Sequence, residues 1–201
     1  MKIAVIDYGA GNLFSVKNAL DYLGMESVVT RDPACMEQAN GLILPGVGAF
    51  PDAMDKLTRA GLVDPIRDLA QKKPFLGICL GMQLLFDEGF EFEPCKGLGL
   101  IPGKVIRIEA PGLAIPHMGY NDLTISNPCA LTARLTTGDY VYFVHSYRAE
   151  TAPEYISAYT LYGEKIPALV CRKNIYGAQF HPEKSGDTGL KILSDFGGLC
   201  K

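Results

Sequence analysis

The stretch Phe75–Gly81, FLGICLG, carries a cysteine between two glycines at the point where an apolar run gives way to a helical pattern. A glycine-flanked residue between a strand and a helix is typical of a nucleophile elbow, in which a tight turn exposes one side chain above a sheet. The helix dipole and free N–H groups would favour the thiolate of Cys79 there. The N–H of Leu80 would then point at the oxyanion formed when the sulfur attacks a carbonyl. A small buried residue at a tight turn is the alternative interpretation.

Strand and helix patterns alternate on the N-terminal side of this stretch, which indicates a parallel sheet covered by helices. Asn12 is suited to cap a helix that ends before Gly24. Pro51 opens a second helical pattern, and Pro65 marks a further helix or a break. Strands are expected over residues 2–7, 25–30, 41–45 and 74–78, and an amphipathic helix over 80–89.

The C-terminal half has a different pattern, because short β-rich stretches follow one another with turn residues between them. They suggest an antiparallel or mixed extension of the same sheet. The predicted fold class is therefore α/β, with a mostly parallel twisted sheet flanked by helices and an added antiparallel or mixed β portion in the second half. We expect a single domain over 1–201. The β-rich stretches are 103–109, 139–147, 154–160, 168–173 and 175–180, and a helix is expected over 188–199.

The composition argues against several function classes. With 48% hydrophobic and 20% charged residues, the chain has the make-up of a globular rather than a disordered protein. The net charge is −3 and no basic block occurs, so nucleic acid is not an expected partner. No apolar run reaches the roughly 18 residues that span a bilayer, and no secretory signal opens the chain. We expect a cytoplasmic protein without membrane contact.

The cysteines have wide, irregular spacings and no C-x-x-C pair, which fits reduced thiols better than a zinc site or a disulfide framework. Five of them are expected to pack or to have no special role: Cys35, Cys95, Cys129, Cys171 and Cys200. The three histidines have no carboxylate cluster around them, so no metal site is expected. No cofactor is expected either, because the glycine-rich loops match neither the dinucleotide fingerprint nor a P-loop.

A candidate base and acid lie in the segment YGAQFHPEKS, where His181 ends a strand pattern and Glu183 follows two residues later. In extended backbone the two side chains project to the same side, so Glu183 can orient the imidazole toward a substrate. With Cys79 they have the composition of a Cys-His-acid triad. The alternatives are a hydrogen-bonded strand-end histidine and a solvated acid. His117 and His145 are weaker candidates, and His145 is expected to be structural or part of a pocket wall.

The loop LPGVGAF ends another strand pattern in a glycine-rich turn. Its amide groups are free of crowding by side chains, so Val47 or Gly48 is placed to donate a second hydrogen bond to an oxyanion. A phosphate-cradling loop is the alternative.

GICLGMQLLF followed by QFHPEKS resembles the triad glutamine amidotransferases, and the resemblance runs from the first strand to the last helix. The segments PGVGAF, PHMGYN, FVHSYRA and HPEKS resemble more specifically the glutaminase subunits of imidazole glycerol phosphate synthases, from histidine biosynthesis. The resemblance implies that Cys79 attacks the side-chain amide of glutamine. His181 would protonate the departing ammonia and later activate water, and Glu183 would orient His181.

The resemblance also assigns the surrounding residues. The amides of Leu80 and Val47 would form the oxyanion hole. The glutamine pocket would be lined by Gly48, Gln83, Ser146 and Tyr147. The implied partner is a (β/α)₈-barrel cyclase subunit in a heterodimer, which uses the ammonia to make imidazole glycerol phosphate and an aminoimidazole carboxamide ribonucleotide. Interface candidates, each of which could equally be an ordinary exposed residue, are Asn12, Met118, Tyr120, Tyr142 and Lys184.

The glycines on both sides of Val47 allow its peptide to rotate. We therefore hypothesise that the isolated chain rests with this oxyanion donor turned away and becomes active with the loaded partner. Two other functions stay open from the residues alone: a thiol hydrolase or peptidase with the same triad, and a silent module that only docks to a partner.

Overall fold

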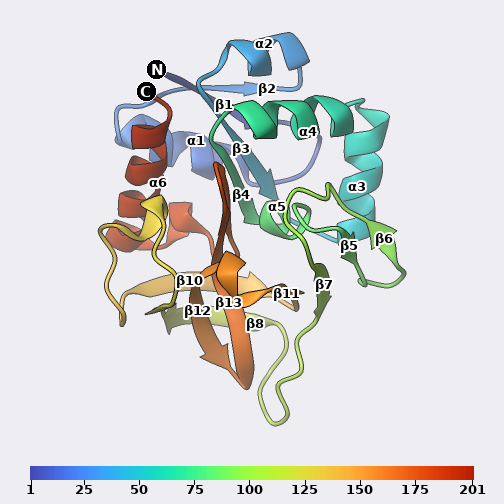
Figure 1. The fold of residues 1–201 in the computed structure, drawn as a ribbon, viewed down its shortest axis with the longest axis vertical. Coiled ribbons are helices and arrows are strands. Elements are labelled where there is room, and N and C mark those ends of the chain that lie inside the picture. The colour runs from blue at the N-terminus through green and yellow to red at the C-terminus, as the bar shows by residue number, and fades with distance from the viewer.

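The main sheet has eight strands in the order β2-β1-β3-β4-β14-β13-β12-β9 (Figure 1). The computed structural model describes all residues from 1 to 201. The strands from β2 to β14 in this order are parallel, and β13, β12 and β9 continue the sheet as antiparallel neighbours. The strands are β1 (Lys2–Ile6), β2 (Glu26–Thr30), β3 (Gly41–Gly46), β4 (Phe75–Cys79), β9 (Thr124–Ile125), β12 (Ile156–Tyr162), β13 (Glu164–Arg172) and β14 (Ile175–Ala178).

Helices cover both faces of the parallel part of this sheet, as the sequence predicts. Two helices, α1 (Leu13–Tyr22) and α6 (Gly186–Leu199), lie together on one side (Figure 1). The opposite side carries α2 (Pro33–Gln38), α3 (Phe50–Arg59) and α4 (Val63–Lys72). The chain termini lie close together at one end of the molecule (Figure 1).

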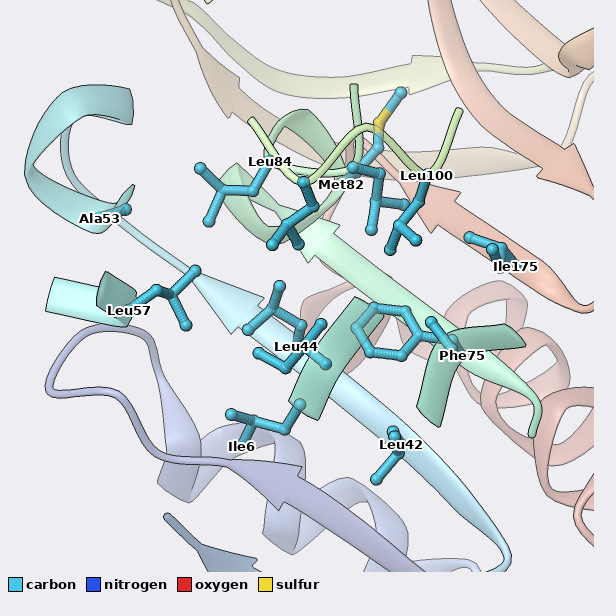
Figure 2. Packing of buried hydrophobic residues seen from close by; sticks show 14 of the residues in the cluster. Ile6, Leu42, Leu44, Ala53, Leu57, Phe75, Met82, Leu84, Leu100 and Ile175 are labelled. Atoms are coloured by element: carbon cyan, nitrogen blue, oxygen red, sulfur yellow. The ribbon is translucent and has the colours of Figure 1, made fainter. Parts of the chain in front are cut away.

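The sheet separates the two large clusters of the hydrophobic core. Along β1, Ile3 and Val5 point into the cluster with α1 and α6, whereas Ala4 and Ile6 point into the other. This alternation is the period of two that a strand buried on both faces requires. Figure 2 shows the second cluster, where Leu42, Leu44 and other side chains of the central strands meet the helices.

Two smaller sheets lie beside the main one, which corrects the prediction that all β-rich stretches of the second half extend a single sheet. Residues 139–147 and 103–109 contain strands, but these strands belong to the two smaller sheets. One sheet joins β8 (His117–Asp122) to β10 (Tyr140–His145). The other has the order β11-β7-β5-β6 and consists of β5 (Glu88–Gly89), β6 (Cys95–Lys96), β7 (Lys104–Arg107) and β11 (Tyr147–Glu150).

The helix expected over residues 80–89 is wrong in its length, because α5 (Leu80–Gln83) makes a single turn. The chain leaves the helix where its carbonyl groups find other donors. The carbonyl of Leu84 accepts from the N–H of Leu98, and the carbonyl of Leu85 accepts from the N–H groups of Leu100 and Ile101. These bonds replace the i to i+4 bonds that would continue the helix.

Short helical segments complete the chain, and one of them, α2, has no counterpart among the predicted elements. Its start has a clear signal, since Asp32 caps the N–H of Ala34 and Pro33 occupies the first turn. None of the helices combines the length and hydropathy that a membrane-spanning helix needs. The 3₁₀ turns are η1 (Ala130–Thr132), η2 (Pro153–Tyr155) and η3 (Pro182–Lys184).

Candidate active site

Cys79 stands at the junction of β4 and α5 in a strained backbone conformation. It ends the strand with φ 55° and ψ −114°, a region that residues with a side chain seldom adopt. Such strain costs about 1–3 kcal/mol and is typical of functional positions. The turn that the G-x-C-x-G pattern predicts is therefore present, with the cysteine at its apex.

The two glycines of this pattern let three backbone segments pack directly against one another. A Cβ atom on Gly77 would lie 2.5 Å from the carbonyl oxygen of Gly81. A Cβ atom on Gly81 would lie 1.8 Å from the carbonyl oxygen of Leu44 on β3. Both contacts are impossible for a real side chain, so the glycines are required for β3, β4 and α5 to approach this closely.

The correction to the length of α5 changes the electrostatics of the cysteine. A single turn aligns few peptide dipoles, so the helix dipole invoked for the thiolate is small. The sulfur contacts other polar groups instead. Its S–H donates to the carbonyl of Val144 at 3.9 Å, and Nε2 of Gln179 lies 4.0 Å away.

His181 and Glu183 form a buried hydrogen-bonded pair. Nδ1–H of His181 donates to Oε1 of Glu183 at 2.8 Å, and both side chains are almost completely buried. This bond fixes the tautomer, so Nε2 is the nitrogen left free, and it has no hydrogen-bond partner. The backbone between the two residues is the 3₁₀ turn η3, not the extended segment expected from the sequence. Pro182 in this turn still brings the carboxylate under the imidazole.

The surroundings of His181 favour its charged form. Burial lowers its pKa, but the nearby sulfur of Cys79 and the hydrogen-bonded carboxylate of Glu183 outweigh the burial and raise the pKa to about 9. An imidazolium at neutral pH is suited to give a proton to a leaving group.

A cavity of about 370 Å³ joins these groups. Its wall includes Cys79 and His181, while Glu183 lies behind the imidazole and does not reach the cavity. All the other residues predicted for the oxyanion hole and the substrate pocket also line it: Val47, Gly48, Leu80, Gln83, Ser146 and Tyr147. Their roles remain predictions, but the structure brings them together around one space.

The loop after β3 lies next to the cysteine. Gly46 pairs with Cys79 in the sheet register, so Val47 and Gly48 follow at the edge where the nucleophile is exposed. Neither the Val47 N–H nor the Gly48 N–H makes a hydrogen bond within the chain. Gly48 has φ 104°, which favours glycine. Both donors are thus unengaged.

Two polar residues of the cavity wall were not predicted as substrate contacts. Glu91 lines the cavity, and its Oε2 accepts from the N–H of Phe50 at the start of α3, at 2.7 Å. The sequence held no signal for it, because the two residues are 41 positions apart and Glu91 lies in an irregular segment. His145 also lines the cavity, in agreement with its expected place in a pocket wall.

The remaining histidines form a neutral pair beside the cavity. Nδ1–H of His145 donates to the carbonyl of Tyr147 at 2.8 Å, which leaves Nε2 to accept from Nδ1–H of His117 at 3.0 Å. Burial lowers the pKa of His145 to about 3, so it stays uncharged beside His181. Nowhere in the chain do three or more His, Cys, Asp or Glu side chains form a cluster able to hold a metal ion.

Three of the interface candidates lie together. Oη of Tyr120 donates to the carbonyl of Lys184 at 2.8 Å, its ring meets that of Tyr142 edge-on at 5.4 Å, and Nζ of Lys184 lies 5.9 Å from the Tyr142 ring. Met118, on the same strand as Tyr120, is 61% exposed. Asn12 instead caps α1 by accepting from Ser15 N–H at 3.3 Å, so it has a structural role of its own.

Comparison with known proteins identifies the family of the chain. The family model for class-I glutamine amidotransferases matches residues 4–197. The chain is 48% identical over 200 residues to the imidazole glycerol phosphate synthase subunit HisH of Bacillus thuringiensis (strain Al Hakam), covering 99% of this chain and 95% of the relative. It is 50% identical over 196 residues to the subunit of the same name from Listeria innocua, covering 96% and 94%.

Solved structures show the same fold. The crystal structure of a glutamine amidotransferase superposes with a TM-score of 0.75 at 23% identity, covering 97% of this chain and 98% of the other. The structure of PurLQS from Thermotoga maritima superposes with a TM-score of 0.77 at 21% identity, covering 100% and 99%. At these identities the structures support the fold alone, whereas the family model and the closer relatives establish the family. The chain belongs to the class-I glutamine amidotransferases.

Proposed function

We propose that this chain, as a single domain over residues 1–201, hydrolyses glutamine to glutamate and ammonia and delivers the ammonia to a cyclase subunit. The observation that carries the proposal is the meeting of Cys79, on its strained turn, with the free Nε2 of His181 at one cavity. A nucleophile, a base held by a third group, and unengaged N–H donors are the parts that acyl transfer requires.

The reaction proceeds in two halves. Cys79 reacts as the thiolate, with its proton held on Nε2 of His181, and the sulfur attacks the side-chain amide carbon of glutamine. The N–H groups of Val47 and Leu80 stabilise the oxyanion. The imidazolium then gives its proton to the amide nitrogen, the C–N bond breaks, and ammonia leaves a glutamyl thioester on Cys79. His181 next removes a proton from water, which attacks the thioester, and glutamate leaves as the thiol re-forms.

The cavity wall offers polar groups for the side-chain amide of glutamine and for its α-ammonium group. Gly48, Gln83, Ser146 and Tyr147 are proposed to hold glutamine in the orientation that the sulfur needs. Glu91 adds a carboxylate to the same wall. Only one of its oxygens is used by Phe50, so the other is available to the α-ammonium group of the substrate.

The ammonia needs an acceptor close by, because ammonia released into water at neutral pH is mostly protonated and not nucleophilic. The relatives from Bacillus and Listeria are named as a subunit of imidazole glycerol phosphate synthase. We propose a cytoplasmic heterodimer in which a (β/α)₈-barrel cyclase subunit makes imidazole glycerol phosphate and an aminoimidazole carboxamide ribonucleotide. The proposed contact surface comprises Asn12, Met118, Tyr120, Tyr142 and Lys184.

The partner also activates the glutaminase in this proposal. Val47 is 46% exposed and its N–H is unengaged, so its peptide can rotate at low cost between an outward and an inward orientation. Binding of the loaded cyclase would favour the inward donor. Equal rates of glutamine hydrolysis by the isolated chain and by the complex would contradict this gating.

The deciding experiment measures glutamate release by the purified chain, alone and with a candidate cyclase subunit and its nucleotide substrate. The wild type is compared with Cys79→Ala and with the control Cys35→Ala, whose thiol lies on α2 and does not line the cavity. Activity that depends on the complex, disappears in Cys79→Ala and persists in Cys35→Ala supports the proposal. Activity that survives Cys79→Ala would exclude the cysteine mechanism. A rate of glutamate release that the cyclase does not change would exclude the proposed cyclase partner.

A further inference from the structure

Gln179 is a fully buried polar residue beside the nucleophile that the proposed mechanism leaves without a role. It directly follows β14 and lies two residues before His181. Its side-chain Nε2 lies 4.0 Å from Sγ of Cys79, and its Oε1 accepts from Nε2 of Gln83 at 3.0 Å. We propose that Gln179 is a positioning residue that holds an N–H toward the sulfur of Cys79 and thereby favours its thiolate.

The orientation of this amide follows from a backbone carbonyl. The carbonyl oxygen of Tyr147 can only accept hydrogen bonds, so the group of Gln83 that lies 3.0 Å from it must be the NH₂. The second N–H of that NH₂ points at Gln179, which must therefore present its oxygen to Gln83. The NH₂ of Gln179 is left at the other end of the amide, facing Cys79.

The same carbonyl is held in place from a second side. His145 donates its Nδ1–H to the oxygen of Tyr147, so this oxygen accepts two hydrogen bonds. A rotation of the Gln83 amide by 180° would set oxygen against oxygen, and a rotation of the Gln179 amide would set NH₂ against NH₂, at about hydrogen-bond distance. The direction of the N–H at the sulfur is thus determined by a connected set of buried hydrogen bonds, which stabilise one another in a medium of low dielectric constant.

The two polar neighbours of the sulfur stabilise opposite protonation states of Cys79. The carbonyl of Val144, 3.9 Å away, accepts from the S–H and so favours the thiol. The N–H of Gln179 favours the thiolate, because it is a donor and the thiolate is an acceptor. Since α5 is only one turn long, its dipole contributes little, and this side chain supplies polar stabilisation that a longer helix would give.

Residue alternation at the end of β14 explains how one segment supplies the side chains of both Gln179 and His181. Gln179 and His181 alternate with Phe180, whose side chain is fully buried in the core cluster on the α1 and α6 side. Residues 179 and 180 form a bend, but the alternation of β14 continues through them, since Tyr176 and Ala178 belong to the same cluster as Phe180. The base and the proposed thiolate donor are therefore carried together to the cavity end of the strand.

The inference rests on the proposed function only in taking Cys79 as the nucleophile, and its test needs no glutamine turnover. The rate of alkylation of Cys79 by iodoacetamide is measured from pH 5 to pH 10 in the full chain, with the modified peptides quantified by mass spectrometry. The variants are Gln179→Met, which keeps the size and removes the N–H, and Gln83→Met, which keeps the N–H of Gln179 but removes the hydrogen bond that orients it. The other cysteines serve as internal controls.

In Gln179→Met the alkylation rate of Cys79 at pH 7 should fall about threefold to tenfold, and the midpoint of its pH profile should rise by up to about one unit. The profiles of the other cysteines should stay unchanged, and Gln83→Met should shift the Cys79 midpoint less than Gln179→Met does. An unshifted Cys79 profile in folded Gln179→Met would overturn the proposal.

If Gln179→Met does not fold, as judged by circular dichroism and urea unfolding, Gln179→Asn replaces it. The asparagine keeps an amide but withdraws the N–H by one methylene group, so slower alkylation at pH 7 is again expected. A wild-type profile in this variant would refute the role of the N–H. Loss of glutaminase activity in Cys79→Ala bears on the proposed function alone, so the two proposals fail independently.

Discussion

Replacing Gly81 by alanine tests whether backbone packing at the turn places the nucleophile. The added Cβ would lie 1.8 Å from the carbonyl oxygen of Leu44, whereas real Cβ contacts essentially never fall below 3.0 Å. The turn and β3 must therefore separate by about 1.2 Å or more, and neither atom is part of a flexible side chain. Cys79 and the N–H of Leu80 move with this turn.

A displacement of about 1 Å at a reacting group can reduce the rate about 100-fold. Overpacking of this kind also costs about 1–3 kcal/mol of stability. Gly81→Ala should therefore lose about 100-fold in kcat/KM for glutamine in the complex and about 2 kcal/mol in the free energy of unfolding. The measurements are glutamate release and urea unfolding followed by circular dichroism.

The matched control is Gly198→Ala on α6, where an added Cβ meets no atom within 4 Å. It should keep full activity and gain about 0.5–1 kcal/mol, because alanine loses less backbone entropy in a helix than glycine. Wild-type activity and stability in Gly81→Ala would refute the argument, since the turn would then be free to adapt.

Three further outcomes are expected. Glu183→Gln keeps an acceptor for His181 but removes the charge, so the pKa of His181 should fall from about 9. The raised pKa of His181 stabilises the wild-type fold below pH 6.5, and this stability is lost as the pH rises through about 9. The difference in free energy of unfolding between wild type and Glu183→Gln, measured in urea, should therefore shrink by about 2 kcal/mol between pH 6 and pH 10. A difference that does not depend on pH would contradict this. Cys79→Gly should be about 1 kcal/mol more stable than Cys79→Ala in urea unfolding, because only glycine accepts φ 55° without strain. A higher stability of Cys79→Ala would show that the turn is not strained. Glu91→Gln keeps an acceptor for the N–H of Phe50 but loses the negative charge. KM for glutamine should therefore rise roughly tenfold with little change in kcat. An unchanged KM would exclude a contact between Glu91 and the ammonium group of the substrate.

Local signals in the sequence predict the elements around the site well. Asn12 caps α1 as expected, and Gly24 follows the end of that helix with φ 68°. The turn at Cys79 was predictable because glycines at two fixed positions have few other uses between a strand and a helix. The hydrogen bond between His181 and Glu183 was predictable because only one residue separates them, although the backbone there is a turn.

Features that depend on distant segments were not predictable in this way. The apolar pattern of residues 80–89 suits a helix, but α5 ends early because the carbonyls of Leu84 and Leu85 accept from the segment 98–101. Glu91 reaches the cavity through a contact with Phe50, 41 positions earlier. The strands β8 and β10 pair apart from the main sheet, and residue alternation carries no information about which strand is the neighbour.

The order of strands in the main sheet explains why the site is assembled from segments so far apart in sequence. β3, β4 and β14 are adjacent and parallel, so the loop with Val47, the turn with Cys79 and the segment with His181 follow the same end of three neighbouring strands. Neighbouring strands lie about 4.8 Å apart. The N–H of Val47, the proposed oxyanion donor, and the imidazole of His181 therefore flank Cys79 on opposite sides, each at about one strand spacing. In the proposed mechanism, a carbonyl carbon above the sulfur would have its oxygen on the side of β3 and its leaving nitrogen on the side of β14, which is the division of tasks that thioester formation from an amide requires.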